Sequence, residues 1–79
     1  VSVMSTLHHM LPADIWMRRI FDAKAARDGG VVRRGRRDID RILGMDRFLH
    51  ELERRGFHAV QNGDQIVIFC NNQAVRLLC

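Results

Sequence analysis

The sequence predicts a small α+β domain, in which two to three helices pack on one face of an antiparallel sheet of about three to four strands. Two observations support this prediction. Apolar residues recur at helical spacing through the first two thirds of the chain. After Phe57 the pattern changes to short apolar runs separated by turn residues. The expected order of elements is α-β-α-α-β-β-β.

The chain has 79 residues, of which 47% are hydrophobic and 28% charged. This length gives room for one domain with one modest core, and the composition is too apolar for a disordered protein. We assign residues 1–11 to a flexible N-terminal tail and residues 12–79 to a single α+β domain.

Several features indicate a cytoplasmic protein. No apolar run approaches the length of a membrane span, and the first residues lack the basic start of a signal peptide. The two cysteines, Cys70 and Cys79, are too few for a disulfide framework and are not spaced as CxxC. We expect both thiols to be reduced, with no membrane partner. Twelve of the thirteen basic residues are arginine, a bias typical of GC-rich bacterial genomes.

The first helix is expected over Leu11 to Gly30. Pro12 suits its first turn, because a proline there loses no hydrogen bond. Its apolar stripe contains Trp16, Met17, Ile20 and Phe21. Gly29 and Gly30 supply the left-handed stop.

A second helical region is expected over residues 38–55. Asp38 can cap its start, Gly44 interrupts the pattern, and Asp46 can cap a fresh helix. Gly56 should end that second helix.

The C-terminal third reads as three strands. Phe57 to Val60 and Gln65 to Cys70 are joined by a predicted hairpin turn at Asn62-Gly63. The second of these strands is apolar on consecutive residues, so we expect it to be central and covered on both faces. Asn71-Asn72 would then turn the chain into a third hairpin strand, Gln73 to Leu78. The residues expected in the core are Trp16, Ile20, Phe48, Leu49, Leu52, Val60, Ile66 and Ile68.

An arginine cluster is the clearest candidate for function. It follows a short strand expected at Val31 and Val32, and it precedes the helix that Asp38 would cap. Its members are Arg33, Arg34, Arg36 and Arg37, around Gly35. Guanidinium groups bind phosphate bidentately, and the formal net charge of +4 favours anionic partners. We expect a non-enzymatic domain that binds a polyanion, with nucleic acid as the partner class, and with Arg54 and Arg55 extending the site where the fold brings them alongside.

Other interpretations remain open. The cluster is also compatible with a solvated connector in an arginine-biased protein. A protein-interaction or self-associating module, including a homodimer, could instead use an exposed strand edge. An enzyme that binds a phosphorylated small molecule is a third class.

A winged helix-turn-helix would share the order helix, short strand, two helices and hairpin. Its reading helix would run from Asp46 to Arg55. The outward residues of that helix are expected to be His50, Glu51 and Glu53, and DNA phosphates repel carboxylates. This acidic face and the shortness of the helix argue against the interpretation.

The stretch from Phe48 to Val75 resembles, in its order of elements, HicA-type RNA-cleaving toxins and folds like that of double-stranded-RNA-binding domains. The matching residues are Leu49, Leu52, Arg55-Gly56-Phe57, Gly63 and Ile66 to Phe69. HicA-type toxins place a catalytic histidine just after the turn. Asp64 and Gln65 stand there in this chain, so the resemblance implies no RNA cleavage.

No motif predicts a metal or cofactor. The four histidines, His8, His9, His50 and His58, lie in separate segments without partners at ligand spacing. Cys70 follows an apolar run and is expected to be a small buried hydrophobe. We therefore expect no cofactor, no metal site and no catalytic residue.

Overall fold

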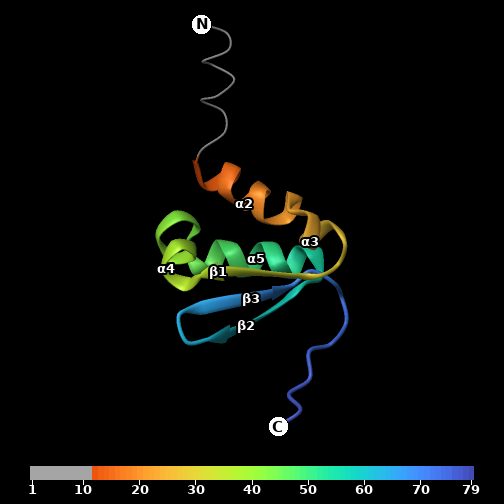
Figure 1. Cartoon of the computed structure of the whole chain (residues 1–79). Coiled ribbons are helices and arrows are strands. Elements are labelled where there is room, and N and C mark those ends of the chain that lie inside the picture. The colour runs from red at the N-terminus through yellow and green to blue at the C-terminus, as the bar shows by residue number, and fades with distance from the viewer. Residues whose placement is uncertain (1–11) are drawn as a thin grey trace, which may run out of the picture.

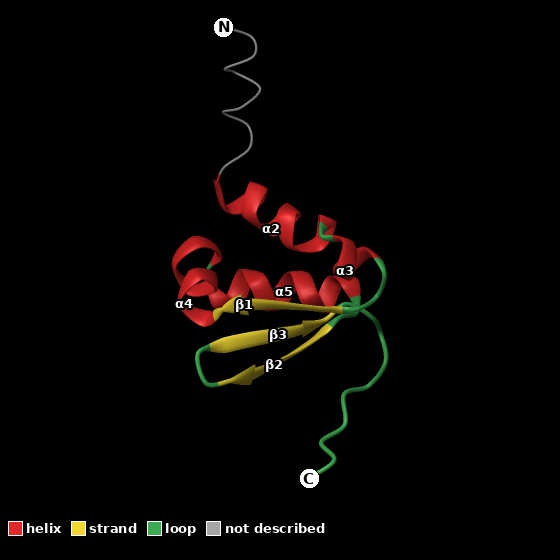
Figure 2. Cartoon of the chain, viewed as in Figure 1, coloured by secondary structure: helices red, strands yellow, loops and turns green. Residues whose placement is uncertain are grey.

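A computed structural model describes residues 12–79 of the chain (Figure 1). The tail assigned to residues 1–11 lies outside this described part. Within it, the α+β prediction is confirmed: helices pack on one face of a three-stranded antiparallel sheet (Figure 2). None of the helices in residues 12–79 is long and apolar enough to cross a membrane.

The elements follow the predicted order, with one break in the first helix and one fewer strand at the end. They are α2 (Pro12–Asp22), α3 (Lys24–Arg27), β1 (Val31–Gly35), α4 (Arg36–Asp38), the π-helix η1 (Ile39–Leu43), α5 (Met45–Arg55), β2 (His58–Asn62) and β3 (Gln65–Phe69).

The first helix is broken at Ala23, where a single helix was expected. A straight continuation of α2 would place Lys24, four residues after Ile20, on the apolar stripe. The extended backbone of Ala23 (φ −58°, ψ 144°) turns α3 so that Ala26 is buried and Lys24 stays exposed. The predicted stop is confirmed at Gly29, whose φ is +77°.

The second helical region starts earlier than expected, because α4 begins at Arg36 with Gly35 as its N-cap. Asp38 occupies the N-cap position of η1, but it has helical dihedrals and its side chain makes no capping hydrogen bond. The predicted cap at Asp46 is wrong, because Gly44 is the N-cap of α5 and Asp46 lies within the helix. The predicted break is confirmed at Gly44, where φ is +84°.

The predicted central position of β3 is confirmed, since the strand order is β1-β3-β2. Asn62 lies opposite Gln65, so the two-residue hairpin turn is Gly63-Asp64, one residue later than expected. Gly63 has a φ of +58° and Asp64 does not have a positive φ, which is the pattern of a type II′ turn.

The expectation that both faces of β3 are covered is wrong. Ile66 and Ile68 point into the core, whereas Val67 and Phe69 on the other face are half-buried. All the described helices lie on the inner face, and no element of residues 12–79 forms a second layer on the outer face of the sheet (Figure 2).

The third hairpin strand expected at Gln73 to Leu78 does not form, and the described chain after Phe69 is irregular. The reason is topological: β1 and β2 occupy both edges of β3, so no neighbouring position remains for a returning strand. The segment leaves the sheet with Leu77 and Leu78 exposed by 93% and 91%.

The predicted core is largely confirmed. Ile20, Phe48, Leu52, Ile66 and Ile68 are buried together, and Trp16 packs against them half-buried. Leu49 and Val60, in contrast, are 48% and 40% exposed.

The cysteines are both free, as expected. Cys70 is buried at the end of β3, and burial raises the pKa of its thiol. This side chain behaves as a small hydrophobe, in agreement with the sequence-based expectation.

Leu52 provides a test of the core. Leu52→Ala should lower the free energy of unfolding by about 2–5 kcal/mol, because the side chain is 3% exposed and its removal leaves a cavity. Leu77→Ala removes the same atoms from a side chain in solvent and should change stability by no more than about 0.5 kcal/mol. Urea unfolding measures both values, and equal losses would show that the core is misassigned.

Candidate polyanion-binding site

The arginine cluster lies at the junction of β1 and α4 and not in a connector between strand and helix. Arg33 and Arg34 belong to β1, and Arg36 and Arg37 form the first turn of α4. Successive strand residues point to opposite faces, so Arg33 lies on the outer face of the sheet and Arg34 on the inner face. The cluster therefore spreads around the junction and does not converge on one point.

Arg36 ties this junction to the β2–β3 hairpin. Its backbone N–H donates to the carbonyl of Asp64 at 2.7 Å, and its guanidinium donates to Oε1 of Gln61 at 3.0 Å. The same guanidinium contacts Asp40 at 3.4 Å. Arg36 thus has a positioning role, because it holds the end of β1 against the turn that follows β2.

Carboxylates offset part of the charge at the junction. Asp38 pairs with Arg41 at 3.1 Å, and Asp40 pairs with Arg36. Asp64 is exposed in the adjacent turn. With Arg41 included, five arginines and three aspartates occupy the junction, so it stays basic.

Three arginines of the cluster keep their charge available. Within residues 12–79, Arg33, Arg34 and Arg37 form no ion pair with a carboxylate. Arg34 donates to the carbonyl oxygen of Arg33 at 2.6 Å, which orients its side chain without neutralising it. Arg33 and Arg37 are exposed. An anionic partner can therefore contact these groups without displacing a carboxylate.

Arg54 and Arg55 lie at the opposite end of α5 from the junction (Figure 1). Both pair with Glu51, Arg54 at 2.7 Å and Arg55 at 2.6 Å. Arg55 also stacks over the ring of Phe21, 4.1 Å from its centroid. The fold does not bring these two arginines alongside the cluster.

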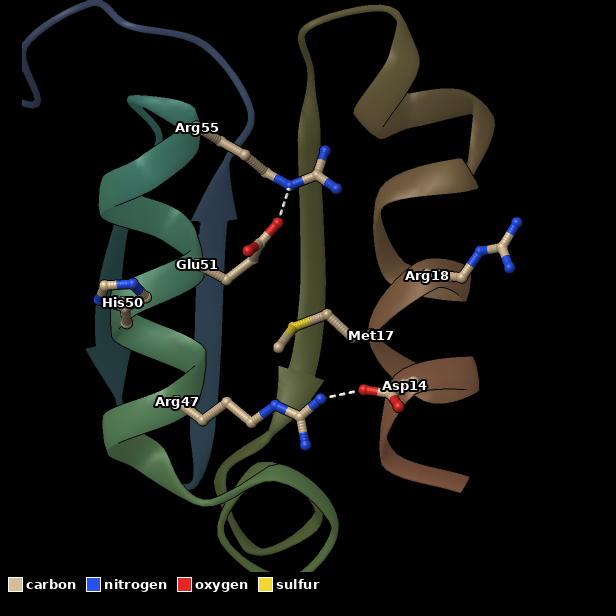
Figure 3. Close-up of a pocket in the computed structure, with 7 residues that line it drawn as sticks. All are labelled: Asp14, Met17, Arg18, Arg47, His50, Glu51 and Arg55. Carbon is tan, nitrogen blue, oxygen red and sulfur yellow. Dashed lines mark hydrogen bonds and ion pairs between the residues drawn. The ribbon is translucent and has the colours of Figure 1, made fainter. Parts of the chain in front are cut away.

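A groove of about 370 Å³ between α2 and α5 is a second feature. It could not be predicted from the sequence, because the apolar periodicity of each helix does not show that the two helices lie side by side. Figure 3 shows Met17 between the two helices, with one ion pair toward each end of the groove. Arg47 binds Asp14, 33 residues away in sequence, and Arg55 binds Glu51. Both carboxylates of the groove are therefore held by arginines, which leaves neither free to act as a general base.

The described residues contain no group of three metal-ligating side chains. His50 lines the groove, while His58 lies on the outer face of β2. Asp64 and Gln65 occupy the hairpin turn and the start of β3, so no histidine follows the turn.

The exposed face of α5 is poorly suited to reading a DNA groove. Asp46, His50 and Glu53 are exposed there, while Glu51 turns toward the groove with α2 and not outward as expected. The observed element order is that of a winged helix-turn-helix, but this helix would present two carboxylates to the phosphates.

No protein-family model, curated protein or solved structure matches this chain.

Glu51 gives a pH-dependent prediction. Hydrogen bonds from Arg54 and then Arg55 lower the pKa of its carboxyl from 4.5 to about 2. Because the folded pKa lies below the unfolded value, this carboxylate stabilises the fold above pH 4.5 and loses that effect as the pH falls toward 2. The difference in unfolding free energy between the wild type and Glu51→Gln should therefore shrink over this range.

Urea unfolding at a series of pH values measures this difference. Glu53→Gln is the matched control, since it removes an exposed carboxylate from the same helix. A gap between the wild type and Glu51→Gln that stays constant down to the lowest pH would contradict the role of the arginine pair.

Proposed function

We propose that this domain binds a polyanion, with nucleic acid as the partner class, through the arginines of the β1–α4 junction. One observation carries the proposal: Arg33, Arg34 and Arg37 lie at one junction, and none of them has a carboxylate partner in the described part of the chain. A guanidinium group offers two parallel N–H donors to a phosphate, so each of them can make a charge-assisted contact.

The spread of the cluster favours a long ligand over a small one. Arg33 and Arg34 project from opposite faces of β1, so they cannot close on a single phosphate group. A nucleic acid presents many phosphates along its length, and separate side chains can contact separate phosphates. Contacts of this type position a protein but carry no sequence information.

The hairpin beside the junction supplies neutral polar groups. Gln61, Asn62 and Gln65 are exposed, and Arg36 fixes the junction against this turn. Amide side chains donate hydrogen bonds to phosphate and sugar oxygens, so they can add contacts without adding charge. We place Arg54 and Arg55 outside the site, because Glu51 and the ring of Phe21 already hold them.

The salt dependence of binding tests the proposal. Fluorescence anisotropy with labelled duplex DNA and RNA should show binding at low salt that weakens steeply as salt rises, nearly equally for unrelated sequences. Replacing Arg33, Arg34 and Arg37 with glutamine should flatten the log–log salt slope on B-form DNA by up to about 2.7, since each phosphate contact contributes about 0.9.

The control variant replaces Arg19, Arg27 and Arg76 with glutamine. These arginines also form no ion pair within residues 12–79, so the loss of net charge is the same while the junction is intact. The control should keep most of the wild-type slope. Binding that is absent at low salt, or lost equally in both variants, would reject a dedicated site at the junction.

A further inference from the structure

The free edge of β2 lacks the usual protection against pairing with another strand. Edge strands are normally blunted by charged side chains, proline or a bulge. His58 to Asn62 contains no acidic residue, lysine, arginine or proline, and its register with β3 runs residue for residue without a bulge. No described segment pairs with its outer side.

The other edge of the sheet is protected. β1 carries two charged residues, Arg33 and Arg34, and self-pairing of this strand would bring like charges together. The short helix α3 also packs against β1. A partner strand is therefore expected at β2 and not at β1.

The hairpin register identifies which backbone groups of β2 are free. A two-residue turn makes Asn62 and Gln65 a hydrogen-bonded pair, and hydrogen-bonded and non-bonded pairs then alternate along the ladder. The backbone N–H and C=O groups of Val60 therefore form hydrogen bonds with Val67. The backbone N–H and C=O groups of Ala59 and Gln61 point away from β3, toward the free edge. These four groups are placed symmetrically about Val60.

The two residues that were expected in the core and found exposed both lie at this edge. Val60, 40% exposed, is at the centre of β2 on the outer face of the sheet. Leu49, 48% exposed, lies on α5 between two hollows of about 220 and 320 Å³, each also lined by Ala59 of β2. An exposed apolar side chain thus lies on each face of the sheet beside the free edge of β2.

We propose that β2 pairs antiparallel with β2 of a second copy of this chain, centred on Val60, to form a six-stranded sheet across a twofold axis. Val60 faces its own counterpart, and Ala59 of each copy exchanges two hydrogen bonds with Gln61 of the partner copy. The axis is perpendicular to the sheet, so both helical layers lie on the same face. The Leu49 side chains of the two copies then approach each other.

A second copy of the chain fits this edge, because the edge is complementary to itself. The free donors and acceptors are symmetric about Val60, as an isologous interface requires. β2 carries no formal charge, so pairing brings no like charges face to face. Each copy contributes one five-residue strand, whereas stable complexes use roughly 20–30 residues a side, so we expect weak, concentration-dependent association.

Sedimentation velocity over a wide concentration range tests the dimer, with Val60→Lys as the disrupting variant. The wild type should shift from monomer to dimer with rising concentration, while Val60→Lys should stay monomeric because two ammonium groups would meet at the axis. Val75→Lys is the matched control, since Val75 is 44% exposed in the C-terminal segment. It should dimerise like the wild type, and circular dichroism checks that both variants fold.

Cross-linking tests the register independently of affinity. In a Cys79→Ser background, Val60→Cys should form an intermolecular disulfide under mild oxidation, because directly opposed non-bonded residues lie about 4.5 Å apart at Cα. Asn62→Cys should not, since the two copies of residue 62 would be separated by about 13 Å, four residues along the strand.

Three results would overturn the proposal. The first is a wild type that remains monomeric at all concentrations. The second is a dimer that survives Val60→Lys, which would place the interface elsewhere, for example at the exposed C-terminal leucines. The third is cross-linking through residue 62 in preference to residue 60. The test is independent of the polyanion site, because the oligomeric state is measured without nucleic acid.

Discussion

The pairing of β3 with both of its neighbours is the constraint on which the rest of the structure depends. This strand pairs with β2 through a two-residue turn, and with β1, whose residues lie 30 to 38 positions before their partners in the chain. Its inward side chains Ile66 and Ile68 then form the floor on which Phe48, Leu52 and Ile20 are buried. The position of β1 also brings the arginine cluster to the hairpin, where Arg36 bonds to Gln61 and Asp64.

The same constraint explains which parts of the fold could be predicted from the sequence. Local signals predicted the breaks at Gly29, Gly44 and Gly56 and the central strand, because positive φ and consecutive apolar residues act over a few residues. The failures are non-local. A strand was expected at Gln73 to Leu78 because Asn71-Asn72 reads as a turn that would return the chain beside β3, but β1 takes that position. Leu49 and Val60 were expected in the core because their spacing fits, yet no described element covers them.

The candidate site was predicted in part. The sequence located the arginines, but it could not show that Asp40 and Asp38 hold Arg36 and Arg41, or that Glu51 holds Arg54 and Arg55. The ion pairs therefore distinguish the guanidinium groups that stabilise the fold from those that are available to a ligand. In the proposed dimer β1 takes both outer edges, so the two copies of Arg33 lie on one face, five strand spacings or about 24 Å apart. One extended polyanion can span that distance.

Backbone hydrogen exchange along β2 tests the arrangement of the sheet most directly. In dilute solution, where the monomer dominates, the amides of His58, Val60 and Asn62 should be protected by β3, while those of Ala59 and Gln61 exchange rapidly. Raising the protein concentration should slow exchange at Ala59 and Gln61 alone. Uniform protection of all five amides in dilute solution would contradict the account, because it would mean that β2 is not a free edge.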